Sequence, residues 1–407
     1  MQCGLLGQKL GHSYSPLIHS FLADYKYTLY EQEPDSIAEF LANSNFSGIN
    51  VTIPYKKAVI PFCHELSDRA RQLGAVNTIV RRPDGTLIGH NTDYFGFYSM
   101  VQKTGLSLAG KKVLVLGSGG ASVTVQAVLQ ELKACVVVIS RSGENNYENI
   151  SRHKDASVIV NTTPVGMYPN TGVSPVDLDL FPCLEGVLDL IYNPARTKLI
   201  MDAETRGLVT ENGLHMLVAQ AKESAEWFSG KSIPDDRIDY IYQKLRMQME
   251  NIVLIGMPGC GKSTIGKLVA KKLDKTFIDA DTMIIEQAKK SIPDIFAQSG
   301  EVGFRKWETA VLADLGKCSG AVIATGGGCV TVADNYPLLH QNSRIYWIKR
   351  EIDQLETDGR PLSKSGNLTD MYQFRKGLYE RFADYTISND KDLEAAANQI
   401  VAMEECL

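Results

Sequence analysis

Two glycine-rich loops in this 407-residue chain have the residue types and the spacing of phosphate-binding sites. The first, GSGGAS at 117–122, follows the apolar run 112–116, and the second, GMPGCGKST at 256–264, follows the apolar run 252–255. A strand that enters a glycine turn and then a helix aims backbone N–H groups and the positive helix end at phosphate. The first loop suits a dinucleotide, and the second suits the triphosphate of ATP or GTP with Mg²⁺. The sequence therefore predicts an oxidoreductase joined to a kinase.

The residues after the next predicted strand, 134–139, bear on the choice of dinucleotide. They read Ser140-Arg141-Ser142, at the place where NAD-selective enzymes put an acid for the ribose hydroxyls. An arginine there favours a 2′-phosphate, and hence NADP, over NAD. The alternative is a solvated surface arginine.

Composition bounds the class of protein. The length suits two or three domains, and a hydrophobic content of 44% is ample for packed cores. No apolar run reaches membrane-spanning length, and the first residues lack the features of a signal peptide. The eight cysteines include no Cys-x-x-Cys pair, which argues against a zinc site and fits the reducing cytoplasm. The net charge is −5 and neither half is basic, so neither a nucleic-acid surface nor a membrane partner is indicated.

Apolar strands alternate with helix-compatible sequence, which predicts an α/β architecture with parallel sheets covered on both faces. We predict an α/β domain over 1–100, with part of 213–240 packing back onto it, and a Rossmann-type domain over 101–240. A linker is expected over 241–250, and a P-loop α/β domain over 251–407. The oligomeric state is not readable from the sequence.

A series of motifs in the first part of the chain resembles shikimate dehydrogenase. The resemblance covers about residues 1–240, in family order. The motifs are GQKLGHSYSPLIHS (7–20), NVTIPYK (50–56), AVNTIV (75–80), NTDYFG (91–96), NTTPVGM (161–167), DLIYNP (189–194) and NGLHMLVAQA (212–221).

The resemblance implies that Lys56 and Asp93 face the substrate and are catalytic. An ammonium group can stabilise the alkoxide that forms when a ketone receives a hydride, and can supply its proton. Without the resemblance, a surface lysine and a helix N-cap would be the preferred interpretations. The other implied substrate ligands are Ser13, Ser15, Thr52, Asn77, Tyr192 and Gln220. The implied NADP contacts are Gly117, Ser118, Gly119, Gly120, Ala121, Arg141, Ser142, Leu190 and Gly213.

The second loop satisfies the Gly-x₄-Gly-Lys-Ser pattern of a P-loop completely. Lys262 should reach the β- and γ-phosphates, and Ser263 should coordinate Mg²⁺. The surrounding motifs resemble shikimate kinase over 250–407, in family order. They are FIDAD (277–281), SIPDIFAQSGEVGFRKWE (291–308), ATGGGCV (324–330), Arg360-Pro361-Leu362, and Arg375 with Leu378-Tyr379.

That second resemblance implies that Asp279 assists Mg²⁺ and that Asp281 binds the acceptor hydroxyls and could serve as the base. As alternate residues of one expected strand, both should share a face. Arg305 and Arg375 would pair with the shikimate carboxylate, since forked donors suit a carboxylate. The implied ATP ligands are Gly259, Cys260, Gly261, Lys262, Ser263, Thr264 and Arg360. The implied kinase substrate ligands are Asp281, Arg305, Gly327, Gly328 and Arg375.

Together the two resemblances predict a bifunctional enzyme that reduces 3-dehydroshikimate with NADPH and then phosphorylates shikimate with ATP and Mg²⁺. The chain departs from both families, because 140–161 is short and 355–359 lacks a lid arginine. One alternative is a quinate dehydrogenase fused to the kinase, although Ser13 and Ser15 favour shikimate. Another is an inactive regulator, which predicts loss of Lys56, Asp93, Lys262 or Asp281, all of which are present.

Overall fold

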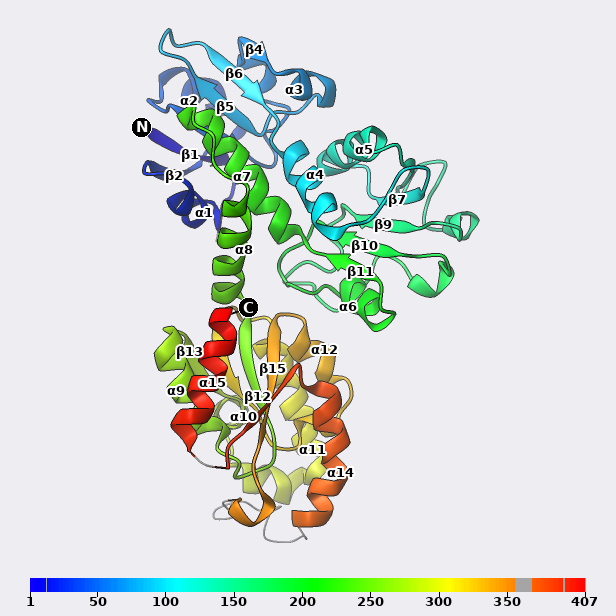
Figure 1. Ribbon diagram of the computed structural model, residues 1–407, viewed down its shortest axis with the longest axis vertical. Coiled ribbons are helices and arrows are strands. Elements are labelled where there is room, and N and C mark those ends of the chain that lie inside the picture. The colour runs from blue at the N-terminus through cyan, green and yellow to red at the C-terminus, as the bar shows by residue number, and fades with distance from the viewer. Residues whose placement is uncertain (12, 356–367, 391, 407) are drawn as a thin grey trace. The chain divides into compact units, whose positions relative to one another are not determined.

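The computed structural model describes residues 1–11, 13–355, 368–390 and 392–406, and the chain forms two compact units (Figure 1). The first unit comprises Met1–Val165, Ser174–Tyr192 and Asp202–Leu245. The second unit comprises Gly166–Val173, Asn193–Met201 and Arg246–Leu407. In the described part of the chain, no helix combines the length and the apolar character needed to cross a membrane.

The first sheet has six strands in the order β2-β1-β3-β5-β6-β4. β1 pairs in parallel with β2 and β3, whereas β5 runs antiparallel to both β3 and β6. This α/β sheet is therefore mixed, because the short connection between β5 and β6 can join only antiparallel strands. The strands are β1 (Gln2–Gly7), β2 (Lys26–Glu31), β3 (Gly48–Val51), β4 (Glu65–Leu66), β5 (Thr78–Arg81) and β6 (Leu87–His90). The helices are α1 (Ser15–Leu22), η1 (Pro34–Ser36), α2 (Ile37–Asn43), η2 (Ile60–Phe62) and α3 (Asp68–Leu73).

The second sheet is parallel throughout, with the strand order β11-β10-β9-β7-β8. Its central strands are fully buried, and α4 and α5 cover them through a shared apolar core. Between β8 and β9 the crossover contains only the short helix η3, in agreement with its short sequence. The strands are β7 (Lys112–Leu116), β8 (Cys135–Ile139), β9 (Val158–Asn161), β10 (Gly186–Asp189) and β11 (Val209–Glu211). The helices are α4 (Asp93–Thr104), α5 (Gly120–Glu131), η3 (Ile150–His153), η4 (Leu178–Leu180) and α6 (Lys198–Thr205).

Helix α7 (Gly213–Ser229) returns from the second sheet to the first and packs along α4 and α1 (Figure 1). Two glycines permit this approach. A Cβ at Gly48 of β3 would lie 2.1 Å from the ring of Phe228, and one at Gly96 of α4 would lie 2.8 Å from the carbonyl oxygen of Met216. Helix α8 (Asp236–Met249) follows α7. α7 thus links the two sheets of the first unit.

The second unit is built on a five-stranded parallel sheet with the order β13-β14-β12-β15-β16. Its strands are β12 (Asn251–Ile255), β13 (Thr276–Asp279), β14 (Ala321–Ala324), β15 (Ser343–Lys349) and β16 (Tyr385–Ser388). Its helices are α9 (Lys262–Leu273), α10 (Ala280–Ala288), α11 (Ile292–Leu315), η5 (Cys329–Thr331), α12 (Asn335–His340), η6 (Ile352–Gln354), α14 (Leu368–Phe382) and α15 (Leu393–Cys406). Ile252, Val253 and Leu254 of the central strand are at most 1% exposed, so helices cover both faces.

A buried ionic cluster closes one end of this unit. Arg344 of β15 is 2% exposed, and it donates to Glu250 at 2.9 Å and to Glu404 of α15 at 3.2 Å. The ammonium group of Lys275 donates to the carbonyl oxygens of Met247 and Glu250, at 2.6 and 2.9 Å. Residues 246–250, which belong to this same unit, are therefore held by its own side chains, with the Lys275 cation at a helix C-terminus where the dipole favours one.

Candidate functional sites

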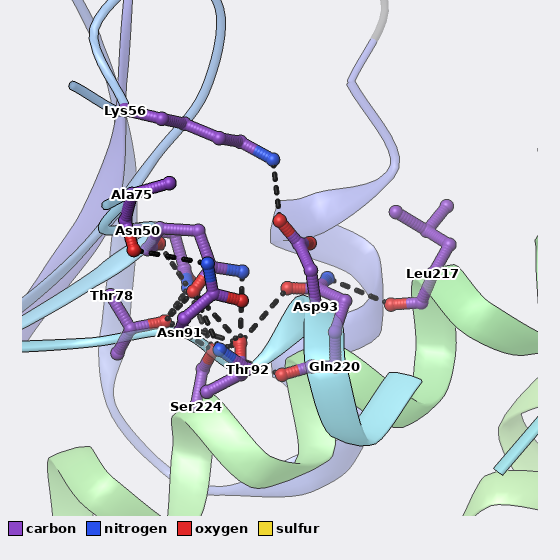
Figure 2. Close-up of polar contacts among 11 residues, drawn as sticks. Asn50, Lys56, Ala75, Thr78, Asn91, Thr92, Asp93, Leu217, Gln220 and Ser224 are labelled. Carbon is purple, nitrogen blue, oxygen red and sulfur yellow. Dashed lines mark hydrogen bonds and ion pairs between the residues drawn. The ribbon is translucent and has the colours of Figure 1, made fainter. Parts of the chain in front are cut away.

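Lys56 and Asp93 lie in contact in the first unit (Figure 2). Lys56 follows β3, and Asp93 is the first residue of α4; the Lys56 ammonium nitrogen lies 2.6 Å from a carboxylate oxygen of Asp93. Their side chains are 30% and 16% exposed, so the pair is sheltered but reachable. Such a pair offers a proton donor held by a carboxylate, which is what reduction of a ketone requires.

Gln220 of α7 lies beside this pair (Figure 2). Its amide nitrogen donates to the carbonyl oxygen of Leu217 at 2.8 Å, which fixes the orientation of the side chain. The hydroxyl of Thr92, the residue before Asp93, lies 3.5 Å from the Gln220 amide oxygen. The structure therefore brings together Lys56, Asp93 and Gln220 from three separate sequence motifs.

The remaining predicted substrate ligands differ in their surroundings. Asn77 is 3% exposed, and its amide oxygen accepts from the backbone N–H of Thr92 at 2.7 Å, so most of its hydrogen-bonding capacity is used internally. The backbone N–H of Ser15 donates to the Ser13 hydroxyl at 3.2 Å, at the start of α1. Thr52, Ser13, Ser15 and Tyr192 are partly exposed. Tyr192 stands edge-on to Tyr14, and burial together with Tyr14 raises its pKa.

The dinucleotide loop has the backbone geometry that its glycines predict. Gly117 has φ of 101°, and a Cβ there would lie 2.9 Å from the Thr162 hydroxyl oxygen, so only glycine fits. A Cβ at Gly119 or Gly120 would meet nothing within 4 Å, and α5 begins at Gly120. Exposed backbone at a helix N-terminus suits a pyrophosphate. Ser118 on the loop and Ala121 in the first turn of α5 are both exposed.

The neighbouring positions also fit an NADP molecule. Arg141 and Ser142 are exposed after β8, and among the described residues no hydrogen bond or ion pair engages the Arg141 side chain. A Cβ at Gly213 would lie 2.0 Å from the carbonyl oxygen of Leu190, so α7 begins against β10 only because this residue is glycine. The free guanidinium group is suited to a 2′-phosphate.

The P-loop joins β12 to α9 in the second unit. Gly256, Gly259 and Gly261 have φ of 144°, 84° and 97°, which is the left-handed region that glycine tolerates. Lys262 is 8% exposed, and its ammonium group donates to the carbonyl oxygens of Gly256 and Met257 at 3.0 and 3.1 Å. This compact cation at a helix N-terminus fits nucleotide phosphates.

The sequence predicts that Asp279 and Asp281, beside the P-loop, lie on one strand. This prediction was wrong. β13 ends at Asp279, which caps α10 by accepting from the backbone N–H of Asp281, and Asp281 lies in the first turn of that helix. The capping carboxylate competes with strand continuation, so the chain turns there. Both aspartates nevertheless line one pocket.

Magnesium could be held beside the P-loop. The Ser263 hydroxyl donates to Asp279 at 2.7 Å, so two oxygen ligands lie together at the start of α9. No group of three or more His, Cys, Asp or Glu side chains in the described part of the chain could hold a metal ion. Mg²⁺ usually keeps water and substrate phosphates as its other ligands, so this pair fits it.

A cavity of about 470 Å³ extends from the P-loop between α10, α11 and α14. Two arginines enter it: Arg375, which donates to the carbonyl oxygen of Gly327 at 3.1 Å, and Arg305. A Cβ at Gly328 would lie 2.1 Å from an Arg305 guanidinium nitrogen, so that group lies flat against the glycine backbone. The other residues that line the cavity include Gly259, Gly261, Thr264, Asp281, Gly326 and Gly327. Cys260 of the P-loop is fully buried, and Arg360 lies outside the described residues.

The motif analysis missed Glu308 in this cavity. Its side chain is fully buried, and it accepts from Arg305 at 2.7 Å. Burial raises the pKa of Glu308, and Arg305 opposes this effect. In the sequence, Arg305 and Glu308 have the spacing of an ordinary surface ion pair on a helix, so only burial distinguishes them.

Comparison with known proteins assigns both parts of the chain. Residues 5–79 match the family model for the shikimate dehydrogenase substrate binding domain. A shikimate dehydrogenase (NADP(+)) of Clostridium perfringens is 36% identical over 265 residues, which cover 60% of this chain and 97% of the relative. The chain belongs to the shikimate dehydrogenase family. Residues 258–404 match the shikimate kinase family model, so the same chain also carries a shikimate kinase domain.

Solved structures agree with the assignment of the dehydrogenase. The chain is similar to a chorismate mutase/shikimate 5-dehydrogenase fusion protein from Clostridium acetobutylicum, with 37% identity and a TM-score of 0.57 over 60% of this chain and 96% of that one. It is also similar to the shikimate 5-dehydrogenase of Thermus thermophilus in complex with NADP(H) and shikimate. There the identity is 28% and the TM-score 0.55, over 60% of this chain and 99% of that one.

Proposed function

We propose that this bifunctional shikimate-pathway enzyme reduces 3-dehydroshikimate to shikimate with NADPH and then converts shikimate to shikimate 3-phosphate with ATP and Mg²⁺. The observation that carries the proposal is that one chain holds both the Lys56–Asp93 pair and a P-loop that opens into a cavity with two arginines. The product of the first site is the substrate of the second. Tethering two such sites raises the local concentration of the shared molecule.

For the reduction, bound NADPH would supply a hydride to the ketone carbon. Lys56 would stabilise the negative charge that forms on the ketone oxygen and would give that oxygen its proton. Asp93, 2.6 Å from the Lys56 ammonium nitrogen, would orient the donor and accept a hydrogen bond from a ring hydroxyl. Gln220 and Tyr192, which are partly exposed, would position the ring acid, and Arg141 would receive the 2′-phosphate.

For the phosphorylation, bound ATP with Mg²⁺ would supply the phosphoryl group. Asp281 would accept the proton of the attacking hydroxyl, and Arg305 and Arg375 would hold the carboxylate of the ring acid through paired donors. Lys262 would move from the carbonyl oxygens of Gly256 and Met257 to the phosphate oxygens. Since both arginines enter the cavity that also holds Asp281, a carboxylate and a hydroxyl of one small acid could be gripped together.

The partners would be these small molecules, and the proposed location is the cytoplasm, which fits eight free cysteines. Two substitutions test the function. In Lys56→Ala, NADPH oxidation with 3-dehydroshikimate should be abolished while ATP turnover with shikimate persists; Lys262→Ala should have the reverse effect. The matched controls are Lys57→Ala, at the exposed lysine next to Lys56, and Lys271→Ala, at an exposed lysine in the last turn of α9.

A folded variant that loses both activities would contradict two independent sites. If the unaltered protein turned over quinate faster than shikimate with NADP⁺, the assignment of the ring acid would be wrong. A single coupled assay of the whole chain with 3-dehydroshikimate, NADPH, ATP and Mg²⁺ should accumulate shikimate 3-phosphate.

A further inference from the structure

Behind the Lys56–Asp93 pair lies a buried cluster of hydroxyl and amide groups that centres on Ser224 of α7 (Figure 2). The Ser224 hydroxyl oxygen lies 2.8 Å from the Asn50 amide nitrogen, 2.8 Å from the Thr78 hydroxyl and 2.9 Å from the Thr92 hydroxyl. It also donates to the carbonyl oxygen of Gln220 at 2.9 Å. Ser224, Thr78 and Thr92 are fully buried, and Asn50 is 6% exposed. Ser224 thus joins α7 to β3, β5 and the start of α4.

The Ser224 hydroxyl has four contacts within 2.9 Å, one more than its hydrogen-bonding capacity. A serine hydroxyl donates one hydrogen bond and accepts two. If Ser224 donates to Gln220, it can accept from the amide of Asn50 and from the hydroxyl of Thr92, while Thr78 donates to the amide oxygen of Asn77 at 3.2 Å. This assignment uses the full capacity of the Ser224 hydroxyl and leaves its 2.8 Å contact with the Thr78 oxygen without a shared proton. An alanine at this position would leave the buried donors of Asn50 and Thr92 without that acceptor.

Two connections lead from Ser224 to the substrate-facing groups Gln220 and Asp93. One is the backbone of Gln220, one helical turn before Ser224 on the same face of α7. The other is Thr92, which precedes Asp93 and whose backbone N–H donates to Asn77 at 2.7 Å. Ser224 touches neither Lys56 nor Asp93 directly, so any effect on the reaction has to pass through the placement of Gln220 and of the Thr92–Asp93 segment.

We propose that Ser224 is a positioning residue of the dehydrogenase: it sets the distance between Gln220 on α7 and Asp93 on α4, and thereby the fit of the ring acid. The inference rests on the proposed dehydrogenase function. The dinucleotide loop lies between β7 and α5, in a different segment of the chain from the residues of this cluster. Among the described residues, no hydrogen bond joins the loop to the cluster. The substitution should therefore affect the ring acid and not NADP⁺.

The test is Ser224→Ala in the full chain, assayed for NADP⁺ reduction by shikimate without ATP. We expect the KM for shikimate to rise about tenfold, since small misplacements of substrate-binding groups are costly. The KM for NADP⁺ should stay within about twofold. Ser229→Ala is the matched control, because Ser229 lies on the same helix and bonds the carbonyl oxygen of Ala225 at 2.8 Å outside the cluster.

An unchanged KM for shikimate would overturn the proposal, as would a parallel loss of kcat and of NADP⁺ affinity, which is what a merely structural residue would cause. If Ser224→Ala does not yield folded protein, Ser224→Cys decides, since it keeps the shape of the side chain but is a weak hydrogen-bonding group. A raised KM for shikimate in that variant supports the proposal, and an unchanged one refutes it. Failure of the unaltered protein to oxidise shikimate would instead refute the proposed function.

Discussion

The buried ion pair of the kinase domain gives a prediction whose size follows from the structure. Arg305 bonds Glu308 at 2.7 Å and Glu301 at 2.8 Å, but the Glu308 side chain is 0% exposed and that of Glu301 is 53% exposed. Removing one partner of a buried pair costs about 3–5 kcal/mol, because the other charge stays buried without compensation. An exposed pair contributes about 1 kcal/mol or less. We therefore expect Glu308→Ala to lower the free energy of unfolding of the kinase domain several times more than Glu301→Ala does.

The chain's three tryptophans make this measurable domain by domain. Only Trp227 lies in the first unit, so in a Trp227→Phe background the fluorescence of Trp307 and Trp347 reports urea unfolding of the second unit. The KM for shikimate in the kinase reaction should also rise in Glu308→Ala, since Arg305 loses the carboxylate that holds it against Gly328. Equal costs for the two substitutions, or a cost below about 1 kcal/mol for Glu308→Ala, would refute the reasoning.

Three further predictions concern single side chains. Arg141→Ala should raise the KM for NADP⁺ at least about tenfold and leave that for NAD⁺ unchanged, as initial rates with both cofactors will show; equal effects on both would contradict a 2′-phosphate contact. Burial raises the pKa of Glu223 to about 7, with Glu226 adding to the effect. Stability should thus be lost as pH rises from about 4.5 through about 7, by at most about 3 kcal/mol. Glu223→Gln should abolish this loss, so thermal melting at pH 5 and pH 8 checks it, and an unchanged pH dependence would refute it. Gly328→Ala should abolish shikimate binding by the kinase, because its Cβ would lie 2.1 Å from Arg305, and calorimetric titration of that variant measures this; unimpaired binding would show that the guanidinium group can move away.

Local patterns were sufficient to predict the phosphate loops. Each depends on a strand, on glycines with positive φ and on a helix start, all of which lie within about ten consecutive residues. The Lys56–Asp93 contact joins residues 37 positions apart. No spacing rule predicts that contact, and only the family resemblance suggested it.

The interior polar residues could not be identified in the same way. Ser224 lies in an ordinary amphipathic helix, and its partners Asn50, Thr78 and Thr92 come from three distant segments, so the cluster exists only after the chain has folded. The strand expected through Asp281 failed for a local reason, because the capping bond of Asp279 starts a helix instead. The antiparallel pairing of β5 was missed since apolar runs do not carry strand direction.

The buried ionic cluster around Arg344 determines where a separately expressed kinase domain should begin. A kinase fragment that starts at Asn251 would lack Glu250, whose carboxylate lies 2.9 Å from Arg344 and whose carbonyl oxygen accepts from Lys275. Arg344 would then lack a carboxylate partner, and Lys275 would lack one of its carbonyl acceptors. A fragment that begins at Arg246 keeps both acceptors of Lys275 and the carboxylate that pairs with Arg344. The slightly longer fragment is therefore the one suited to separate expression of the kinase domain.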